Sequence, residues 1–228
     1  MIPCYIQNRD TLAVRAMIEK LWECEQALPI IVDCGSTFPP LLDWLREAER
    51  NGTSVVRVDP AHHNKAAWAV PAAARPAEPL GVYMASDGDL DITGLPRDFL
   101  LVMREQLLER ADLVKVGCAL EVVDLPAACP VALDAARHEA QFWMTEDRLC
   151  LLRGYRADID TTLALYRSGQ GWGGYGPSLR IAGPYTVRHI PWYLTWENIT
   201  PDWLWYFEHL EVLHGLGWTP RLREIFRG

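Results

Sequence analysis

The first half of the chain alternates short apolar runs with amphipathic stretches, and this order restricts its fold more than any other feature. The apolar runs predict strands at residues 3–7, 28–33, 53–59, 80–85 and 112–120. The stretches with helical periodicity predict helices at residues 11–25, 39–50 and 96–110. The run LPIIVD at 28–33 is apolar up to its final acid, which is typical of a strand buried on both faces. Strands that alternate with helices form βαβ crossovers, so we expect an α/β fold with a mostly parallel central sheet flanked by helices.

The regular alternation ends near residue 125. The rest of the chain is rich in glycine and tryptophan, with seven of the ten tryptophans from Trp143 onward, and short helices are predicted there at 134–145 and 201–216. Apart from an Ala/Pro stretch at 70–79, no linker or internal repeat divides the sequence. We therefore expect a single domain over residues 1–228, with a regular half (1–125) and an irregular half (126–228) that helps to build a site.

The charge balance and the cysteine spacing exclude several classes of protein. With 22 Lys and Arg against 30 Asp and Glu, the net charge is −8, so the surface offers no general attraction for nucleic acid. The six cysteines contain no CxxC pair, which argues against a zinc ribbon or a redox motif. No run approaches the roughly 18 apolar residues of a transmembrane helix, and the first residues lack the pattern of a secretory signal. We expect a cytoplasmic protein with free thiols.

Polar residues follow three of the predicted strands: Asn8-Arg9-Asp10, Asp33 with Ser36, and Asp87-Gly88-Asp89. In open α/β sheets, ligands bind beyond the carboxyl ends of the strands. Asp87 and Asp89 can share one face because side chains alternate along a strand, and Gly88 would let a ligand approach the backbone. Two such carboxylates repel each other unless a divalent cation lies between them and the ligand. An acidic surface turn is the alternative interpretation, and the buried run before Asp87 favours a functional site.

Five short segments follow one another along the chain: IQNRD (6–10), IIVDCGSTFPPLLDWL (30–45), SDGDLD (86–91), DTTLALYR (160–167) and RHIPWY (188–193). Together they resemble the GT-A glycosyltransferases, in particular the nucleotide-sugar enzymes of glycosyltransferase family 2. SDGDLD matches the Asp-x-Asp motif of that group, DTTLALYR is similar to its acidic acceptor-site segment, and RHIPWY is similar to its C-terminal His segment. The resemblance implies a GT-A, Rossmann-like domain in which residues 1–125 bind the nucleotide sugar and residues 126–228 bind the acceptor.

The resemblance also implies roles for individual residues around a nucleotide-sugar donor. Asn8, Arg9 and Asp33 would meet its base and ribose. Apart from the resemblance, Ser36 and Gly88 are candidates because they follow the same strand ends, and Lys65 could border the diphosphate or simply be a solvated residue of a predicted loop. Asp87 would contact the ribose or the metal, Asp89 would ligate the metal directly, and His189 would complete the metal site. A carboxylate, an imidazole and diphosphate oxygens suit Mn²⁺ or Mg²⁺, with water at the remaining positions. Without the resemblance, a structural role is the alternative interpretation of His189.

The general base has two candidates. Asp160 matches the catalytic base of inverting members, although many of those enzymes have Glu-Asp where this chain has Ile159-Asp160. Glu139 in RHEAQFW is the rival, and Asp160 could instead be only the N-cap of a helix-like run at 160–167. A carboxylate within hydrogen-bond reach of an acceptor hydroxyl would take its proton as it attacks.

Aromatic side chains are candidate platforms for a sugar, because the C–H faces of sugars are apolar. The candidates are Trp143, Trp172, Trp192, Tyr193 and Trp196. The aromatic residues at 203–207 are expected to belong to the core instead.

The sequence therefore predicts a metal-dependent glycosyltransferase of the hexosyltransferase type. Its donor would be a nucleotide sugar, with a UDP-sugar favoured over a GDP-sugar, and its acceptor a hydroxyl of a glycan, a glycolipid or a small metabolite. An Asp general base favours inversion. Two alternatives stay open: an inactive carbohydrate-binding or membrane-peripheral scaffold on the same fold, and a sugar nucleotidyltransferase. IQNRD lacks the Gly-rich loop of the latter. We expect no nucleic-acid partner, no transmembrane segment and at most weak peripheral contact with a membrane.

Overall fold

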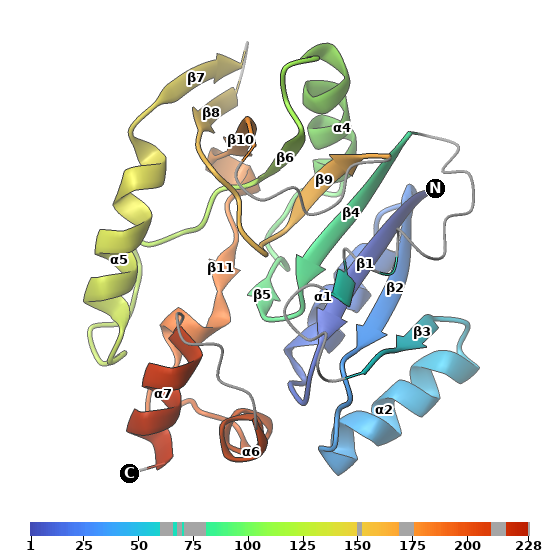
Figure 1. Ribbon diagram of the computed structural model, residues 1–228, viewed down its shortest axis with the longest axis vertical. Helices are drawn as coiled ribbons and strands as arrows, with labels where there is room; N and C mark the ends of the chain where they lie inside the picture. The colour runs from blue at the N-terminus through green and yellow to red at the C-terminus, as the bar shows by residue number, and fades with distance from the viewer. Residues whose placement is uncertain are drawn as a thin grey trace.

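Strands from both halves of the chain lie side by side in one sheet (Figure 1). The computed structural model describes residues 1–59, 66–67, 70, 81–149, 152–168, 176–210 and 218–227. In these ranges the sheet contains β1 (Ile2–Asn8), β2 (Ala27–Asp33), β3 (Ser54–Arg57), β4 (Val82–Asp87), β6 (Lys115–Cys118), β7 (Glu146–Leu149), β8 (Leu152–Arg156), β9 (Ala164–Arg167) and β10 (Ser178–Ile181). A separate two-stranded sheet is formed by β5 (Leu90–Asp91) and β11 (Arg188–His189). The helices are α1 (Ala13–Trp22), α2 (Pro39–Arg50), α4 (Phe99–Glu109), α5 (Ala132–Ala140), α6 (Pro201–His209) and α7 (Trp218–Arg227), with 3-10 turns η2 (Gln141–Trp143), η3 (Gly183–Tyr185) and η4 (Ile190–Tyr193).

The strand order of the large sheet is β3-β2-β1-β4-β9-β6-β10-β8-β7. The neighbours β3, β2, β1 and β4 pair in parallel, and so do β6 and β10. β9 lies antiparallel between β4 and β6, and β8 lies antiparallel between β10 and β7. All the strands of this sheet except β8 and β9 therefore run in one direction. The prediction of an α/β fold with a mostly parallel central sheet is confirmed.

β1 illustrates how the sheet is buried on both faces. Cys4 and Ile6 point into the main hydrophobic core, which they share with apolar side chains of α1, α2 and α4. Tyr5, one position along the strand, points to the opposite face and belongs to a second cluster with Tyr83 and Tyr166, whose rings stack 5.3 Å apart. Alternating side chains thus enter two different cores, which is why the strand is apolar from Ile2 to Ile6.

The helices that cover the main core are amphipathic, as the periodicity of the sequence predicts. α1 buries four residues with helical spacing: Val14, Met17, Ile18 and Leu21. α2 begins with Pro39 and Pro40, whose fixed φ angles suit the first turn of a helix. It then buries Leu41, Leu45 and Ala48 against the sheet.

The second half of the chain is more regular than the sequence predicts, because it supplies β7, β8, β9 and β10 to the sheet. The prediction of a helix-like run at 160–167 is wrong, since residues 164–167 form β9. Leu163 and Leu165 are fully buried, and periodicity cannot distinguish a short buried strand from a buried helix segment. Asp160 precedes a strand rather than a helix, so the N-cap interpretation of this residue is also wrong.

The helices of the second half differ from the prediction at their ends. α5 and η2 together occupy most of the range predicted as one helix at 134–145. α6 occupies the first part of the range predicted at 201–216, of which 211–217 lie outside the described residues. α7 was not predicted. None of the helices in the described ranges combines the length and the apolar character needed to cross a lipid bilayer.

β6 and β9 approach each other closely at Gly117. A Cβ at this position would overlap the carbonyl oxygen of Leu163 and would lie 2.9 Å from Cδ1 of Ile159 and 3.0 Å from Cβ of Ala164. Backbone atoms cannot yield in the way that the end of a flexible side chain can. Glycine is therefore required where these two strands pair.

Replacing Gly117 by alanine is expected to lower the free energy of unfolding by about 2 kcal/mol, because the added methyl group forces the paired strands apart. Urea denaturation of wild type and Gly117→Ala measures this difference. Gly94→Ala is the matched control, since a Cβ at Gly94 would meet nothing within 4 Å. Equal losses of stability in the two variants would contradict the packing argument.

Candidate functional site

The carboxyl ends of β1, β2 and β4 lie at the same edge of the large sheet (Figure 1). Asn8 at the end of β1 is in register with Asp33 at the end of β2, and Gln7 is in register with Asp87 at the end of β4. α6 and α7 lie beyond this edge in the same view. The register thus brings the polar strand ends into one region, where ligands bind in open α/β sheets.

Asp89 and His189 come together although they are far apart in the sequence. The antiparallel pair β5–β11 puts His189 opposite Leu90, and the amide of Ile190 donates to the carbonyl oxygen of Asp89 at 2.9 Å. Nε2 of His189 then lies 3.4 Å from Oδ2 of Asp89. Oδ1 of Asp89 and Nδ1 of His189 are buried and make no hydrogen bond among the described residues. A carboxylate and an imidazole therefore face each other with unused hydrogen-bonding capacity.

Asp87 has a different environment from Asp89. Nε2 of Gln7 donates a hydrogen bond to Oδ1 of Asp87, and the backbone amide of Asp87 donates to the carbonyl oxygen of Thr161 at 2.9 Å. Burial raises the pKa of Asp87 well above its usual value, the charges of Asp89 and Asp160 raise it further, and hydrogen bonds with Thr161 and Gln7 oppose the rise. Three carboxylates therefore act on one another at this edge of the sheet.

The predicted metal ligands are not assembled as one group. Among the residues that the structure describes, no three His, Cys, Asp or Glu side chains are arranged to hold a metal ion. Asp89 and His189 are adjacent, whereas Asp87 is engaged with Gln7. Two of the three predicted ligands, Asp89 and His189, therefore lie side by side in the described part of the chain.

The two candidate bases have opposite surroundings. Asp160 is exposed and adjoins Thr161, which contacts Asp87. Glu139 is only 1% exposed, and its carboxylate accepts a hydrogen bond from Nη1 of Arg180. Burial raises the pKa of Glu139 to about 7, while the charge of Arg180 and its hydrogen bond lower it. Such a pKa suits a base, but a buried carboxylate bound to arginine has no access to an acceptor, so the geometry favours Asp160.

Asn8 and Gly88 make contacts within the protein. Nδ2 of Asn8 donates to the carbonyl oxygen of Thr11 at 2.9 Å, and the hydroxyl of Thr11 donates back to Oδ1 of Asn8 at 2.8 Å. A Cβ on Gly88 would lie 2.9 Å from the carbonyl oxygen of Gln7 and 3.0 Å from Oδ1 of Asn8. The small size of Gly88 is therefore required by the end of β1 itself, without reference to a ligand.

Asp33 and Ser36 bind the loops that follow β1 and β2 to each other. Oδ1 of Asp33 accepts a hydrogen bond from the amide of Ser36 at 3.2 Å, and Oγ of Ser36 accepts one from the amide of Asp10 at 2.9 Å. Asp33 is 4% exposed. Both predicted residues lie at the sheet edge, in a hydrogen-bonded loop rather than on an open surface.

Asp10 organises the start of α2. It is fully buried, and its backbone has a positive φ of 62°, which Asp and Asn tolerate better than most residues. Oδ1 of Asp10 accepts hydrogen bonds from the amides of Thr37 at 2.5 Å and Phe38 at 2.8 Å. The carboxylate of Asp10 thus binds the two backbone amides that directly precede α2.

α6 extends the site with residues that the sequence analysis assigned to the core. Burial raises the pKa of Tyr206, the charges of Asp89 and Asp87 raise it further, and a hydrogen bond with Thr219 and the charge of Arg9 lower it. The charges of the two carboxylates therefore act on Tyr206. Arg9 is 8% exposed, its Nε makes no hydrogen bond among the described residues, and it can supply positive charge at this edge.

Two contacts attach α6 to the N-terminal half. Oδ2 of Asp202 accepts a hydrogen bond from the amide of Leu12 at 2.7 Å. Nε1 of Trp205 donates to Oγ1 of Thr37 at 3.0 Å. α6 is thereby fixed over the loops that follow β1 and β2.

The aromatic candidates differ in exposure. Trp192 is 3% exposed and packs edge-on against His189, with ring centroids 4.7 Å apart. Trp143 and Tyr193 are half-buried, and Trp196 is 63% exposed with one edge against Phe226. Two further predicted residues, Lys65 and Trp172, lie outside the described residues.

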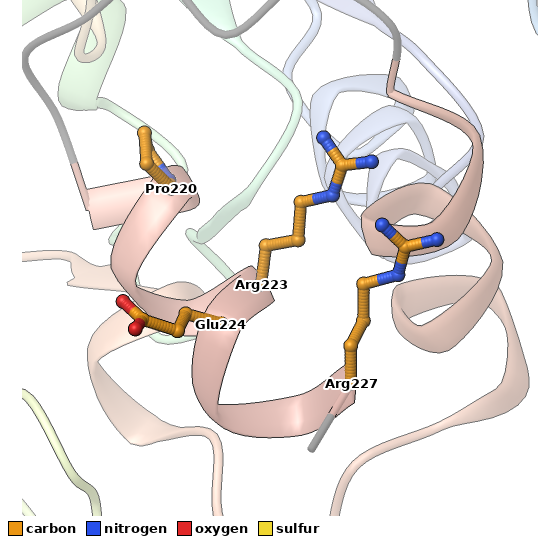
Figure 2. A pocket seen from close by; sticks show the side chains of 4 residues that line it. All are labelled: Pro220, Arg223, Glu224 and Arg227. Carbon is orange, nitrogen blue, oxygen red and sulfur yellow. The ribbon is translucent and has the colours of Figure 1, made fainter.

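An open hollow on α7 is lined by Pro220, Arg223, Glu224 and Arg227 (Figure 2). Arg223 and Arg227 extend to the same side of the helix (Figure 2), and Nη1 of Arg223 donates to the carbonyl oxygen of Leu210 at 2.9 Å. No residue from the ends of β1, β2 or β4 lines this hollow. The carboxylates at the sheet edge are therefore the better candidate site.

Sequence reasoning missed three polar residues that support the site. Gln7, Lys115 and Arg180 each lie inside a buried strand, with exposures of 4%, 0% and 3%. The available signal was a long polar side chain within a short run of apolar residues, because a polar group is rarely buried without a specific partner.

The structure predicts that Asp10→Ala is more destabilising than Asp10→Asn. The alanine variant leaves the amides of Thr37 and Phe38 without their acceptor. It also lacks the short polar side chain that helps Asp and Asn to adopt a positive φ, so we expect a loss of about 3 kcal/mol in the free energy of unfolding. Asparagine keeps an acceptor oxygen and tolerates the backbone conformation, so its loss should be less than half as large. Urea denaturation distinguishes the two, and similar losses would show that the acceptor oxygen of Asp10 does not stabilise the residues before α2.

No family model and no curated protein matches the sequence. Among solved structures, the chain is similar to the mannosyltransferase PcManGT from Pyrobaculum calidifontis in complex with GDP-Man and Mn²⁺, with 12% identity, a TM-score of 0.45, and coverage of 73% of this chain and 44% of that one. It is similar to glucosyl-3-phosphoglycerate synthase from Mycobacterium tuberculosis in complex with Mn²⁺ and UDP-glucose, with 17% identity, a TM-score of 0.43, and coverage of 76% and 61%. It is also similar to S. aureus TarS 1-349, with 12% identity, a TM-score of 0.46, and coverage of 73% and 47%. The match spans less than two thirds of each of these three proteins.

Proposed function

We propose that the protein is a metal-dependent glycosyltransferase that transfers a sugar from a nucleotide sugar to a hydroxyl acceptor. The observation that carries this proposal is the pair of Asp89 and His189 beside Asp87, at the edge where the parallel strands end. Buried polar atoms without a hydrogen bond are rare in folded proteins. Oδ1 of Asp89 and Nδ1 of His189 are two such atoms in one place, which supports a ligand site there.

A divalent cation fits this pair. A carboxylate and an imidazole are both acceptable ligands for Mn²⁺ and, with more oxygen donors, for Mg²⁺. Asp89 and His189 would hold the ion, and oxygens of the diphosphate and of water would provide the other ligands. When bound, such an ion supplies Lewis-acid stabilisation of the charge that develops on a leaving diphosphate.

The donor would extend from these two residues along the ends of the strands. Arg9 and Asp33 lie at the ends of β1 and β2, where a guanidinium can bind a phosphate oxygen and a carboxylate can accept from a ring N–H or a ribose hydroxyl. The sequence resemblance favours a UDP-sugar. The hydroxyl acceptor would be part of a glycan, a glycolipid or a small metabolite.

Asp160 is the proposed general base. Its carboxylate is exposed, next to the contact between Thr161 and Asp87. It would accept the proton of the acceptor hydroxyl while that oxygen attacks the anomeric carbon, and the diphosphate would leave from the opposite face with inversion.

The metal-bridged donor site predicts a nucleotide response that depends on Asp89. UDP or GDP with Mn²⁺ should raise the unfolding midpoint of wild type by about 5 °C at a concentration near 100 times its Kd, because the ligand binds only the native state. Asp89→Ala should abolish the part of the shift that requires Mn²⁺. Asp43→Asn, on the exposed surface of α2, is the matched control and should respond as wild type does. If no nucleotide shifts the midpoint of wild type with or without Mn²⁺, the proposal fails and an inactive scaffold becomes the better explanation.

Asp160→Asn should lower kcat by about 100-fold or more, because the acceptor hydroxyl loses its proton acceptor. UDP with Mn²⁺ should still stabilise this variant, since the proposed metal-binding residues Asp89 and His189 are unchanged. Initial rates of nucleotide release from UDP-sugars with a panel of hydroxyl acceptors measure kcat. A variant as fast as wild type would exclude Asp160 as the base.

A further inference from the structure

We propose that Lys115 and the Arg180–Glu139 ion pair are positioning residues for Asp160, because Lys115 and Arg180 bind the backbone carbonyl groups of the two residues that precede it. The role of Asp160 as the base rests on the proposed function. The restraint of the backbone before Asp160 by these hydrogen bonds does not. Neither the donor site nor the proton transfer uses these buried charges.

Arg180 connects this segment to Glu139 of α5. Nε of Arg180 donates to the carbonyl oxygen of Asp158 at 2.7 Å, while Nη1 donates to the carboxylate of Glu139. The guanidinium also lies 4.1 Å from the centre of the Phe142 ring. Arg180 is 3% exposed and Glu139 is 1% exposed. The planar guanidinium is therefore fixed on several sides and has little freedom to release the carbonyl group.

Lys115 binds the next residue along the segment. Nζ of Lys115 donates to the carbonyl oxygen of Ile159, and Lys115 is fully buried. Burial lowers the pKa of Lys115, whereas the charges of Asp158 and Asp160 raise it. Two buried cations thus hold two successive carbonyl groups, directly before the exposed carboxylate of Asp160.

The contact on the other side of Asp160 completes the arrangement. The carbonyl oxygen of Thr161 accepts the amide of Asp87, and the carbonyl oxygen of Leu163 accepts the amide of Cys118 at 3.2 Å. The carbonyl groups before and after Asp160 are therefore bound, while its side chain is exposed. These contacts restrict the position of the Asp160 backbone, which a free loop would not do. This matters because misplacing a catalytic group by about 1 Å can lower the reaction rate roughly 100-fold.

Stability alone does not explain why charges occupy these positions. Removing a charge from water is unfavourable, and apolar residues of similar volume often stabilise a fold as well as a buried ion pair does. A methionine at residue 115 or 180 could fill the space but could not donate to the carbonyl groups of Asp158 and Ile159. Donation to a specific backbone atom is what the charged side chains add.

The test uses variants that remove the hydrogen bonds to the carbonyl groups of Asp158 and Ile159 without leaving an unpaired buried charge. In the double variant Glu139→Gln/Arg180→Met, both partners lose their charge at similar volume, so the fold should be kept. Lys115→Met is the second variant, and Arg50→Met on the exposed surface of α2 is the matched control. Circular dichroism and thermal unfolding establish that each variant is folded.

Hydrogen exchange tests whether these side chains restrain the backbone of residues 158–161, and it requires no substrate. The amide of Asp87 reports on its contact with Thr161, and it should exchange about ten times faster in the double variant and in Lys115→Met than in wild type or Arg50→Met. The amide of Val58 donates to the carbonyl oxygen of Asp33 at 2.9 Å, next to β2 and β3, which β1 and β4 separate from β9. It should exchange at an unchanged rate. An unchanged rate at Asp87 in both folded variants overturns the inference.

Kinetics test the consequence for Asp160. We expect kcat to fall about 30-fold or more in both variants, with the KM for the nucleotide sugar and the stabilisation by UDP and Mn²⁺ within two-fold of wild type. Faster exchange with an unchanged kcat overturns the positioning role. If wild type neither binds a nucleotide with Mn²⁺ nor transfers a sugar, the proposed function fails, and exchange at Asp87 still decides whether these residues hold the segment.

Discussion

The insertion of β9 between β4 and β6 is the constraint on which the candidate site depends. β9 runs antiparallel to both neighbours, so the residues before it lie at the edge where β4 ends. The amide of Asp87 can therefore donate to the carbonyl oxygen of Thr161, and Asp160 lies next to that contact. A parallel strand in this position would begin at the opposite edge, roughly 13 Å away for four residues. The direction of one short strand thus decides which carboxylates can meet.

Gathering carboxylates at one edge has an electrostatic cost that other groups reduce. The charges of Asp89 and Asp160 act on Asp87, together with its burial, and two hydrogen bonds oppose their effect. Lys115 and Arg180 are the buried cations behind the same segment, and both are influenced by the charge of Asp160. These two cations and a bound divalent ion would both weaken the repulsion between the carboxylates, because each adds positive charge near them.

The sequence predicts the N-terminal half of the fold well and the C-terminal half poorly. Runs such as LPIIVD identify their strands because a continuous apolar run ending in a polar residue matches a strand buried on both faces. The segment at 160–167 was mistaken for a helix because Leu163 and Leu165 are buried by strands from elsewhere in the chain, which no local pattern records. Gln7 was overlooked because its partner, Asp87, is 80 residues away.

By itself, the sequence determined the local features of this protein: the strand–helix alternation, the amphipathic faces of α1 and α2, and acidic residues at strand ends. These depend on neighbours within a few positions, so periodicity and residue type suffice. Only the tertiary structure decided that Asp89 faces His189, that Glu139 is bound to Arg180, and that Asp160 is exposed. These contacts depend on the register and direction of strands across the sheet, because the partners of each side chain come from distant segments of the chain. The exposure of a residue likewise depends on how the whole core packs.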